Sequence, residues 1–557
     1  QSPFSETEHI FANLGDGTYY HSGLLAIRQA ISAKVNITFK ILFNSAVAMT
    51  GGQAVDGPLS VEKLSWQLFG ESIEKIVILS PTPEQYKDVK AFAPNVEFYH
   101  RDDLEKVQRN LRVYKGVSVL IFDQYCANEL RRKRKRNEIE TPNKRLFIYD
   151  AVCEGCGDCS VQSNCVSISA KETVYGRKRE INQSACNLDF SCLKGFCPSF
   201  VTLYGAQLKK QKQSENIDLF NDQSLPTPTY QTTDQPYSIL ITGVGGNGVI
   251  TISALLGMAC HLEGKGVSVL DMTGLAQKNG AVISHIRIAK RYEDIYAAKI
   301  PAGEADLMLG YDLMTSVGYD SLAKLKKGRS KIILNDHILM PIEFARNPDL
   351  TFPYTEIKQS LLHCVNDHDS DFIDAHKIAR RLLGDAIGAN FFLIGYAYQK
   401  GLLPIHHEAI LKAIDLNEIS ISFNKNAFTL GRWAAHDLNH ITKAMNFDQP
   451  IEKLDTFEKI RQHRFKKLKA YQNERYANRY FSFLDKVQHA ETTLKQDHHY
   501  LFSKTVAFGL AKIMTYKDEY EVARLFNKAD FLNQISQHFT GDIEIENQTL
   551  NETLNTE

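Results

Sequence analysis

Residues 152–165 read Val-Cys-Glu-Gly-Cys-Gly-Asp-Cys-Ser-Val-Gln-Ser-Asn-Cys, with three cysteines at intervals of three residues. Seven of the chain's ten cysteines fall between Cys153 and Cys197, where a random distribution would place roughly one. Thiolates at this spacing turn inward from one tight loop toward a common inorganic centre. A C-x2-C-x2-C run followed later by Cys197-Pro198 is typical of ferredoxin-type iron–sulfur ligation. This segment therefore predicts a small iron–sulfur domain and a role in electron transfer.

The cysteines form two half-motifs, and in ferredoxins with two clusters each half-motif lends its last cysteine to the other cluster. This exchange predicts a [4Fe–4S] cluster held by four thiolates and a second centre with only three thiolates. The first ligand set is Cys153, Cys156, Cys159 and Cys197; the second is Cys165, Cys186, Cys192 and Asp189. At the second centre Asp189 is a ligand, or the site holds a three-iron cluster, or it is empty. Zinc held by thiolates is the alternative to iron.

The composition describes an ordinary globular protein of several domains. At 557 residues the chain has room for roughly three to four domains. Its formal net charge of zero predicts neither a nucleic-acid nor a membrane partner. No apolar run approaches the ~18 residues that a membrane-spanning helix needs. Clustered cysteines bind metal rather than pair as disulfides in a reducing compartment, so we expect a cytoplasmic protein.

The first part of the chain alternates strand-like and helix-like patterns. Residues 35–43 alternate apolar and polar residues at period two. Residues 75–79 and 116–122 are continuous apolar runs, which are typical of buried parallel strands. Ser60 is expected to cap a helix. These patterns predict an α/β layer domain.

We expect an α/β multidomain protein with five segments. Composition and periodicity divide the chain as follows: 1–125, an α/β domain; 126–206, a basic segment and a ferredoxin-like iron–sulfur domain; 207–236, a proline-containing linker; 237–404, a second α/β domain; and 405–557, a helical domain.

A candidate diphosphate and metal motif stands near the start of the chain, in Asn13-Leu-Gly-Asp-Gly-Thr18. Its glycines would let the backbone approach a diphosphate closely, and Asp16 offers an anionic oxygen to Mg²⁺. Asn44, at the end of the period-two strand, supplies a neutral oxygen, and the carbonyl of Ala46 could supply a third. A simple turn is the alternative for such a tripeptide. The addition of Asn44 after a strand favours a magnesium–diphosphate site.

These residues lead to a known family. Gly15-Asp16-Gly17 with Asn44 resembles the thiamine diphosphate motif, and residues 44–53, Asn-Ser-Ala-Val-Ala-Met-Thr-Gly-Gly-Gln, resemble its version in 2-oxoacid:ferredoxin oxidoreductases. The cysteine motifs closely resemble the fused bacterial indolepyruvate ferredoxin oxidoreductases. The resemblance continues through 243–248 and 274–285 and ends in 516–524. Because the motifs occur in one order, the resemblance covers nearly the whole chain as the C-terminal portion of such an enzyme.

The resemblance implies oxidative decarboxylation of aryl 2-oxoacids such as indolepyruvate to acyl-CoA and CO₂, with electrons passing through iron–sulfur clusters to ferredoxin. It implies thiamine diphosphate and Mg²⁺ as cofactors, the 2-oxoacid and coenzyme A as substrates, and a homo-oligomer. The cofactor-binding residues that it implies are Gly15, Asp16, Gly17, Thr18, Asn44, Ala46, Thr50, Gly51, Gly52 and Gln53. Asp16, Asn44 and Ala46 are the implied Mg²⁺ ligands.

No catalytic side chain is assigned, because the glutamate that activates the cofactor in thiamine enzymes belongs to a separate pyrimidine-binding domain. In the fused family that domain precedes the part seen here, and this chain has no room for it. We therefore expect a truncated enzyme or one that depends on a partner subunit.

Two weaker motifs leave alternatives open. Residues 243–248 fit G-x-G-x-x-G, with Asp271 after a later strand, which alone would suggest an NAD(P)-linked iron–sulfur reductase. The resemblance instead makes 237–404 the gamma-type domain of the family, with a glycine loop that helps with coenzyme A. The basic run 131–136 is either a solvated loop or a docking site for an acidic ferredoxin. A non-catalytic electron-transfer subunit is the remaining alternative function.

Overall fold

The computed structural model of the chain describes residues 4–47, 53–55, 57, 59–86, 88–165, 167–183, 185–209, 220, 222–245, 248–273, 280–347, 349–445, 454–494 and 500–547. The chain divides into two compact units, Gln1–Thr141 and Pro142–Glu557. In the described ranges no helix combines the length and the apolar character that crossing a bilayer requires.

The first unit is built on a five-stranded, fully parallel sheet in the order β1-β2-β7-β5-β6. Its strands are β1 (Ile10–Gly15), β2 (Ile37–Phe43), β5 (Lys75–Ser80), β6 (Val96–His100) and β7 (Val117–Asp123). The three strands expected from periodicity are therefore confirmed. A short hairpin, β3 (Ala46–Val47) and β4 (Gln53–Ala54), follows β2.

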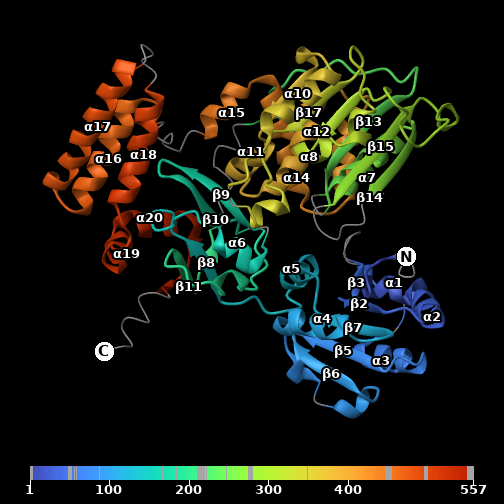
Figure 1. Cartoon of the computed structure of the whole chain (residues 1–557). Coiled ribbons are helices and arrows are strands. Elements are labelled where there is room, and N and C mark those ends of the chain that lie inside the picture. The colour runs from blue at the N-terminus through green and yellow to red at the C-terminus, as the bar shows by residue number, and fades with distance from the viewer. Residues whose placement is uncertain are drawn as a thin grey trace. The chain divides into compact units, whose positions relative to one another are not determined.

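Helices cover both faces of this sheet (Figure 1). They are α1 (Asp16–Thr18), a π turn (Tyr19–Gly23), α2 (Leu24–Ser32), α3 (Val61–Gly70), α4 (Leu104–Arg112) and α5 (Ala127–Lys135). Ile27 of α2 and Leu64 of α3 share one apolar core, and Leu111 of α4 belongs to another. Ser60 caps α3 by accepting from the N–H of Lys63, as predicted. The basic run is largely helical, within α5, so the loop expected there is wrong.

A six-stranded sheet forms the largest layer of the second unit, in the order β14-β15-β13-β16-β17-β18. Its strands are β13 (Tyr237–Val244), β14 (Gly266–Thr273), β15 (Ala281–Ala289), β16 (Leu307–Gly310), β17 (Lys331–Asn335) and β18 (Ser370–Ile373). β15 runs antiparallel to both β13 and β14, and the strands from β13 to β18 are parallel. The sheet is thus mixed, with the antiparallel strand inserted beside β13.

Helices cover both faces of the six-stranded sheet. They are α7 (Val249–Leu262), α8 (Leu313–Ser316), α9 (Tyr319–Leu322), α10 (Tyr354–Cys364), α11 (Ala375–Leu382), α12 (Ala389–Gln399), α13 (His407–Leu416), α14 (Ile421–His436) and α15 (Leu438–Met445). Buried side chains of α7, α12, α13 and α14 share one core with the sheet. The boundary expected at 404/405 falls inside this core. Part of the expected linker also packs here, where the hydroxyls of Tyr230 and Tyr398 lie 2.8 Å apart.

The cysteine-bearing segment forms a small domain around β8 (Lys144–Ile148), β9 (Ile168–Thr173), β10 (Gly176–Ile181) and β11 (Phe200–Tyr204), with α6 (Asp158–Ser163) between β8 and β9. β9 and β10 make a hairpin. β11 lies between β8 and β20 (Glu544–Asn547), a strand from the far end of the chain. The far end also contributes β19 (Phe539–Thr540), which pairs with β12 (Gln207–Leu208).

The remaining C-terminal helices fall into two groups. α16 (Phe457–Tyr471), α17 (Glu474–Leu494) and α18 (Leu501–Met514) pack into a bundle with its own core (Figure 1). α19 (Glu519–Phe526) and α20 (Ala529–His538) instead pack on the cysteine domain, where Leu525 and Phe531 share a core with Tyr149 and Val201. The helices after residue 405 thus pack into three separate hydrophobic cores.

The closest helix crossing in the second unit gives a test of this packing. A Cβ on Gly395 of α12 would overlap the carbonyl oxygen of Phe428 in α14, and a Cβ on Gly431 would overlap that of Phe392. Gly395→Ala should therefore lower the free energy of unfolding by about 1–3 kcal/mol. Gly509→Ala in α18 is the matched control, because a Cβ there meets open space and should stabilise by about 0.5–1 kcal/mol. Calorimetric unfolding of both variants checks this, and an unchanged Gly395→Ala transition would contradict the packing.

Candidate functional site

Asp16 lies buried at the carboxyl end of β1, where it begins α1. Its Oδ1 accepts a hydrogen bond from the N–H of Gly17 at 2.9 Å. Its Oδ2 accepts from the N–H groups of Asn44 at 3.0 Å and Ser45 at 2.6 Å. These bonds use three of the roughly four lone-pair directions of a carboxylate. The carboxylate is thus held in one orientation with an acceptor position remaining.

Asn44 follows β2, the parallel neighbour of β1, so its side chain lies at the same edge of the sheet as Asp16. Its Oδ1 accepts from the N–H of Ala46 at 3.0 Å, which leaves one lone pair of that oxygen. Ser45 between them has a φ of 58°, a left-handed conformation uncommon outside glycine. The sequence offered no signal for Ser45, since serine has no special preference for this conformation.

The oxygens fit a hard divalent cation, because a carboxylate, an amide and a backbone carbonyl are the ligands that Mg²⁺ takes in proteins. Gly17 and Thr18 start the helical stretch that continues through the π turn into α2. Amide groups at such a helix start attract a diphosphate. Thr50, Gly51 and Gly52 lie outside the described residues, and Gln53 is described only as part of β4.

The four thiols expected around the first centre gather on one side of the cysteine domain. Burial raises the pKa of Cys159 to about 12, and negative charge on Cys197 and Cys153 adds to the rise. Burial likewise raises the pKa of Cys197, with charge on Cys153 and Cys156 acting in the same direction. Cys197 packs against the core that contains Cys153 and Cys159, so it has returned to the Cys153–Cys159 loop. Cys156 is exposed, whereas Cys153 and Cys159 are buried.

The second expected set also comes together. Burial raises the pKa of Cys192 to about 12, and charge on Cys165, Cys186 and Asp189 adds to the rise. The pKa of Cys186 is raised for the same reasons. Asp189 is exposed, and its Oδ1 accepts from the N–H of Ser191 at 3.3 Å. The thiols of Cys165, Cys186 and Cys192 and the carboxylate of Asp189 are therefore near enough to influence one another's charge.

Local backbone structure holds the thiols in place. Gly155 and Gly157 have φ angles of 74° and 82°, and a Cβ on Gly155 would collide with the carbonyl oxygen of Arg177. The loop can therefore approach β10 only with glycine at that position. The N–H of Gly155 donates to the sulfur of Cys153 at 3.3 Å. Such bonds to sulfur are one of the means by which proteins tune iron–sulfur centres.

The donor chemistry of both sets fits iron–sulfur clusters, which are bound by cysteine thiolates. All ten cysteines lie in the described residues, and each is a free thiol. Among the described residues, no three His, Cys, Asp or Glu side chains close around a single bare ion.

Cations beside the first thiol set were missed from the sequence. Arg179 of β10 is buried, and this burial lowers its pKa. Negative charge on Cys159 and Cys153 acts in the opposite direction and favours the charged guanidinium. Its guanidinium lies 4.3 Å from the ring centroid of Phe344. Lys178 is buried beside Cys153, and burial lowers its pKa. The only sequence signal was the basic composition of 177–179, directly after a turn glycine.

The glycine-rich loop before α7 does not build a dinucleotide fold. In that fold the strand carrying the acidic residue pairs with the first strand, whereas β15 separates β14 from β13 here. Asp271 Oδ1 accepts from the hydroxyls of Ser253 at 2.8 Å and Ser284 at 2.5 Å. Gly248 is needed for packing, because a Cβ there would lie 2.7 Å from Nδ2 of Asn390. Gly246 and Asn247 lie outside the described residues.

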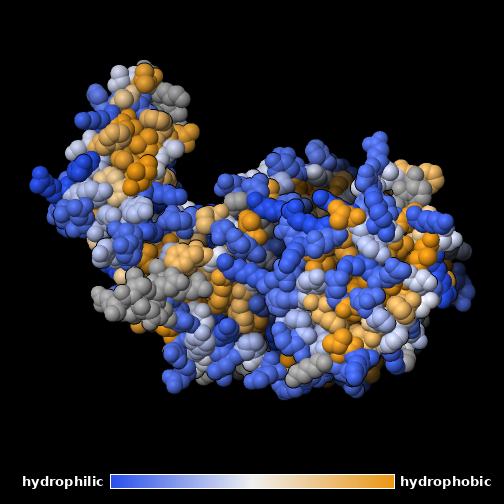
Figure 2. All heavy atoms as spheres, turned by 60° about the horizontal axis from the view of Figure 1, so that its bottom comes forward, coloured by the Kyte–Doolittle hydropathy of each residue, from blue (hydrophilic) through white to orange (hydrophobic). Residues whose placement is uncertain are grey.

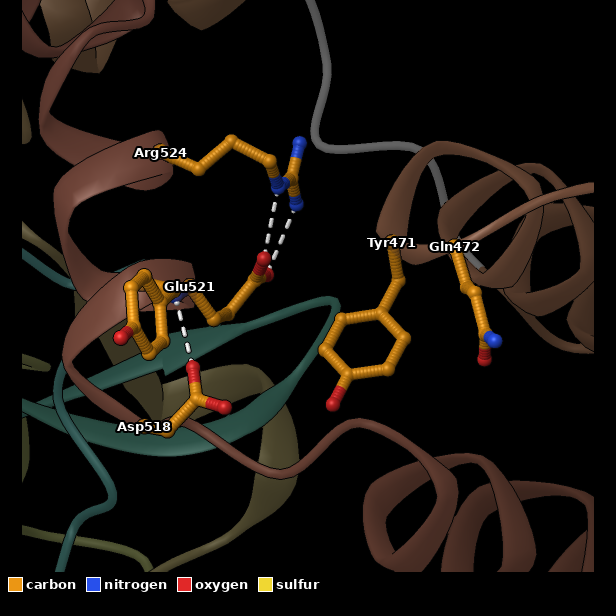
Figure 3. A pocket seen from close by; sticks show the side chains of 6 residues that line it. Tyr471, Gln472, Asp518, Glu521 and Arg524 are labelled. Atoms are coloured by element: carbon orange, nitrogen blue, oxygen red, sulfur yellow. Dashed lines mark hydrogen bonds and ion pairs between the residues drawn. The ribbon is translucent and has the colours of Figure 1, made fainter.

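A pocket of about 270 Å³ opens between the end of α16 and α19 (Figure 3). Its walls are Tyr471, Gln472, Asp518, Tyr520, Glu521 and Arg524. Glu521 and Arg524 bind each other through two hydrogen bonds of 2.6 and 2.7 Å, and Asp518 caps α19. The charged groups of the pocket are therefore already paired with one another or cap a helix.

The sequence of the six-stranded domain matches one class of protein. A family described as pyruvate ferredoxin/flavodoxin oxidoreductase matches residues 238–434. The chain is 32% identical over 206 residues to indolepyruvate oxidoreductase subunit IorB of Thermococcus kodakarensis, which is 36% of this chain and 97% of that subunit. The chain belongs to the 2-oxoacid:ferredoxin oxidoreductase family.

Three further similarities accompany that match. Subunit IorA of Thermococcus kodakarensis is 27% identical over 187 residues, which is 32% of this chain and 26% of that subunit. The solved gamma subunit of a keto/oxoacid ferredoxin oxidoreductase from Geobacter sulfurreducens shares 20% identity, with 36% of this chain and 98% of that one covered and a TM-score of 0.26. Residues 457–556 match DUF6537, a family of unknown function.

Iron analysis tests the first thiol set. Cys156→Ala should remove about half of the iron or more, because Cys156 belongs to one of two sets. Cys364→Ala is the matched control, since Cys364 lies in α10, outside both sets, and should leave the iron unchanged. Iron and sulfide are measured on anaerobically purified protein. Unchanged iron in Cys156→Ala, or zinc in place of iron, would contradict the assignment.

Proposed function

We propose that this chain couples the oxidative decarboxylation of an aryl 2-oxoacid, such as indolepyruvate, to the reduction of ferredoxin, with acyl-CoA and CO₂ as products. The observation that carries the proposal is the fixed Asp16 carboxylate at the carboxyl ends of β1 and β2, with Asn44 beside it. A single core that contains five of the seven clustered cysteines also supports it. Named relatives that are indolepyruvate oxidoreductase subunits support the choice of substrate.

In this proposal the first unit holds thiamine diphosphate through Mg²⁺. Asp16, Asn44 and the carbonyl of Ala46 hold the ion, and the backbone around Gly15, Gly17 and Thr18 lies beside the diphosphate. When bound, the cofactor supplies the electron sink that decarboxylation of a 2-oxoacid requires. Asp16 contributes orientation as well as charge, since three N–H groups hold it before any ligand binds. Thr50, Gly51, Gly52 and Gln53 are proposed to lie near the cofactor.

The thiol sets would then carry single electrons toward ferredoxin. Cys153, Cys156, Cys159 and Cys197 hold a [4Fe–4S] cluster in this proposal. Cys165, Cys186 and Cys192 hold the second centre, with Asp189 as the candidate fourth ligand. Exposure of Cys156 favours the first centre as the point from which electrons leave.

The proposed domains are the thiamine diphosphate unit, the iron–sulfur domain and the gamma-type domain, which takes part in the use of coenzyme A. A pyrimidine-side partner completes the cofactor site, and the assembly is a homo-oligomer in the cytoplasm. Ten free thiols suit that reducing compartment.

Calorimetric titration with thiamine diphosphate and Mg²⁺ tests the first site. Asp16→Asn should weaken Mg²⁺-dependent binding about tenfold or more, because it removes the charge but retains one acceptor oxygen for the surrounding N–H groups. Asp88→Asn is the matched control, since Asp88 only caps a turn at Lys90.

The iron–sulfur absorbance near 400 nm should remain in Asp16→Asn, because the thiols lie in the other unit. Equal binding by wild type and Asp16→Asn would contradict the metal assignment. Loss of both cofactor binding and cluster absorbance would show that Asp16 acts only through the fold.

A further inference from the structure

The turn after α18 makes direct contact with the loop of the first thiol set. The ammonium group of Lys517 donates to the carbonyl oxygens of Val152 at 3.0 Å and Cys153 at 3.4 Å. The same group forms an ion pair of 2.5 Å with Glu154. The region matched by the family of unknown function thus reaches the residues that precede the exposed Cys156.

Positive charge is concentrated around this contact. Lys512 lies 3.8 Å from Glu154, so one carboxylate faces two lysines. Burial, together with the charges of Lys517 and its neighbours, lowers the pKa of Lys467 to about 8. Four lysines thus lie around the one carboxylate of Glu154, and Asp518 and Glu519 follow Lys517 directly in the chain.

Two large side chains that are adjacent in sequence to Lys512 and Lys517 are exposed to solvent. Ile513 is 80% exposed and Tyr516 is 73% exposed, while the side chain of Lys512 is 71% exposed. Figure 2 shows apolar side chains at the surface of the bundle among polar ones. We call Lys512, Ile513, Tyr516 and the edge of the Cys153–Cys159 loop the basic–apolar face. An apolar centre with a basic rim is the usual composition of a docking surface for an acidic protein.

We propose that the basic–apolar face docks an acidic one-electron carrier protein, which takes electrons from the first thiol-bound centre beside Cys156. This inference rests on the proposed function and gives the C-terminal family region a role in it. Its charge selects an acidic partner, and its small apolar centre suits the weak, transient contact of redox proteins. The α5 run is less suited, because Arg132 and Lys133 already pair with Glu129 and Glu138.

Binding of a recombinant acidic two-cluster ferredoxin to the anaerobically purified full chain tests this face. In calorimetric titrations at low salt, Lys512→Glu and Ile513→Ser should each raise Kd about fivefold or more. The effect of Lys512→Glu should shrink at high salt, whereas that of Ile513→Ser should persist, because salt screens charge but not apolar contact. Lys327→Glu is the matched control, an exposed lysine of the six-stranded domain, and should bind like wild type.

Ile513 is exposed, so Ile513→Ser should unfold like wild type, while Lys512→Glu should lose only about 1 kcal/mol or less from its solvent-exposed pair with Glu154. Wild-type affinity in both variants would overturn the proposal, as would loss of binding only on neutralising the run in α5. Dissociation of a self-associated chain by the same variants, without a change in ferredoxin binding, would show that a second copy occupies the face. Ferredoxin binding by a chain that holds no iron would contradict the proposed function but support the basic–apolar face. A chain that holds iron but binds no ferredoxin would contradict the face and leave the cluster assignment supported.

Discussion

The cysteine-bearing domain depends on residues from the far end of the chain for its core. A segment of this size buries little apolar surface of its own, and only two of its seven thiols are fully buried. β20 adds an outer strand to β11, and Phe531 and Leu525 pack against Tyr149 and Val201. Lys517 then binds the carbonyl oxygens that lead into the thiol loop. The C-terminal residues therefore contribute to the sheet of this domain, to its core and to the charges around the thiol loop.

Both candidate sites hold charged groups in fixed positions at a cost in free energy. The Asp16 carboxylate loses solvation, and neighbouring thiolates would repel one another. In the first unit, backbone N–H groups surround the Asp16 carboxylate, and parallel strands bring Asn44 to the same edge. In the second unit, positive-φ glycines shape the loop, and Arg179 and Lys178 oppose the charge that thiolates bring. Preorganisation of this kind lowers the cost of binding a charged cofactor.

Local features of the sequence predicted local structure well. Apolar runs located β5 and β7, and Ser60 marked the start of α3. Cysteine spacing predicted a thiol-rich core, which the structure shows, whereas the division of the thiols into two ligand sets stays a prediction. Pairing of β20 with β11 could not be predicted, since strand pairing between distant residues leaves no periodic signal. The same limit applies to α13 and α14, whose helical pattern does not say which core they join.

Electron paramagnetic resonance of the full chain, purified without oxygen and reduced with dithionite, tests the central claim most directly. That claim is that the gathered thiols hold iron–sulfur clusters beneath the returning C-terminal segment. Brown protein that gives the signals of reduced [4Fe–4S] clusters is the predicted result. Colourless protein with zinc bound to the thiols, and no such signals after reduction, would contradict the account.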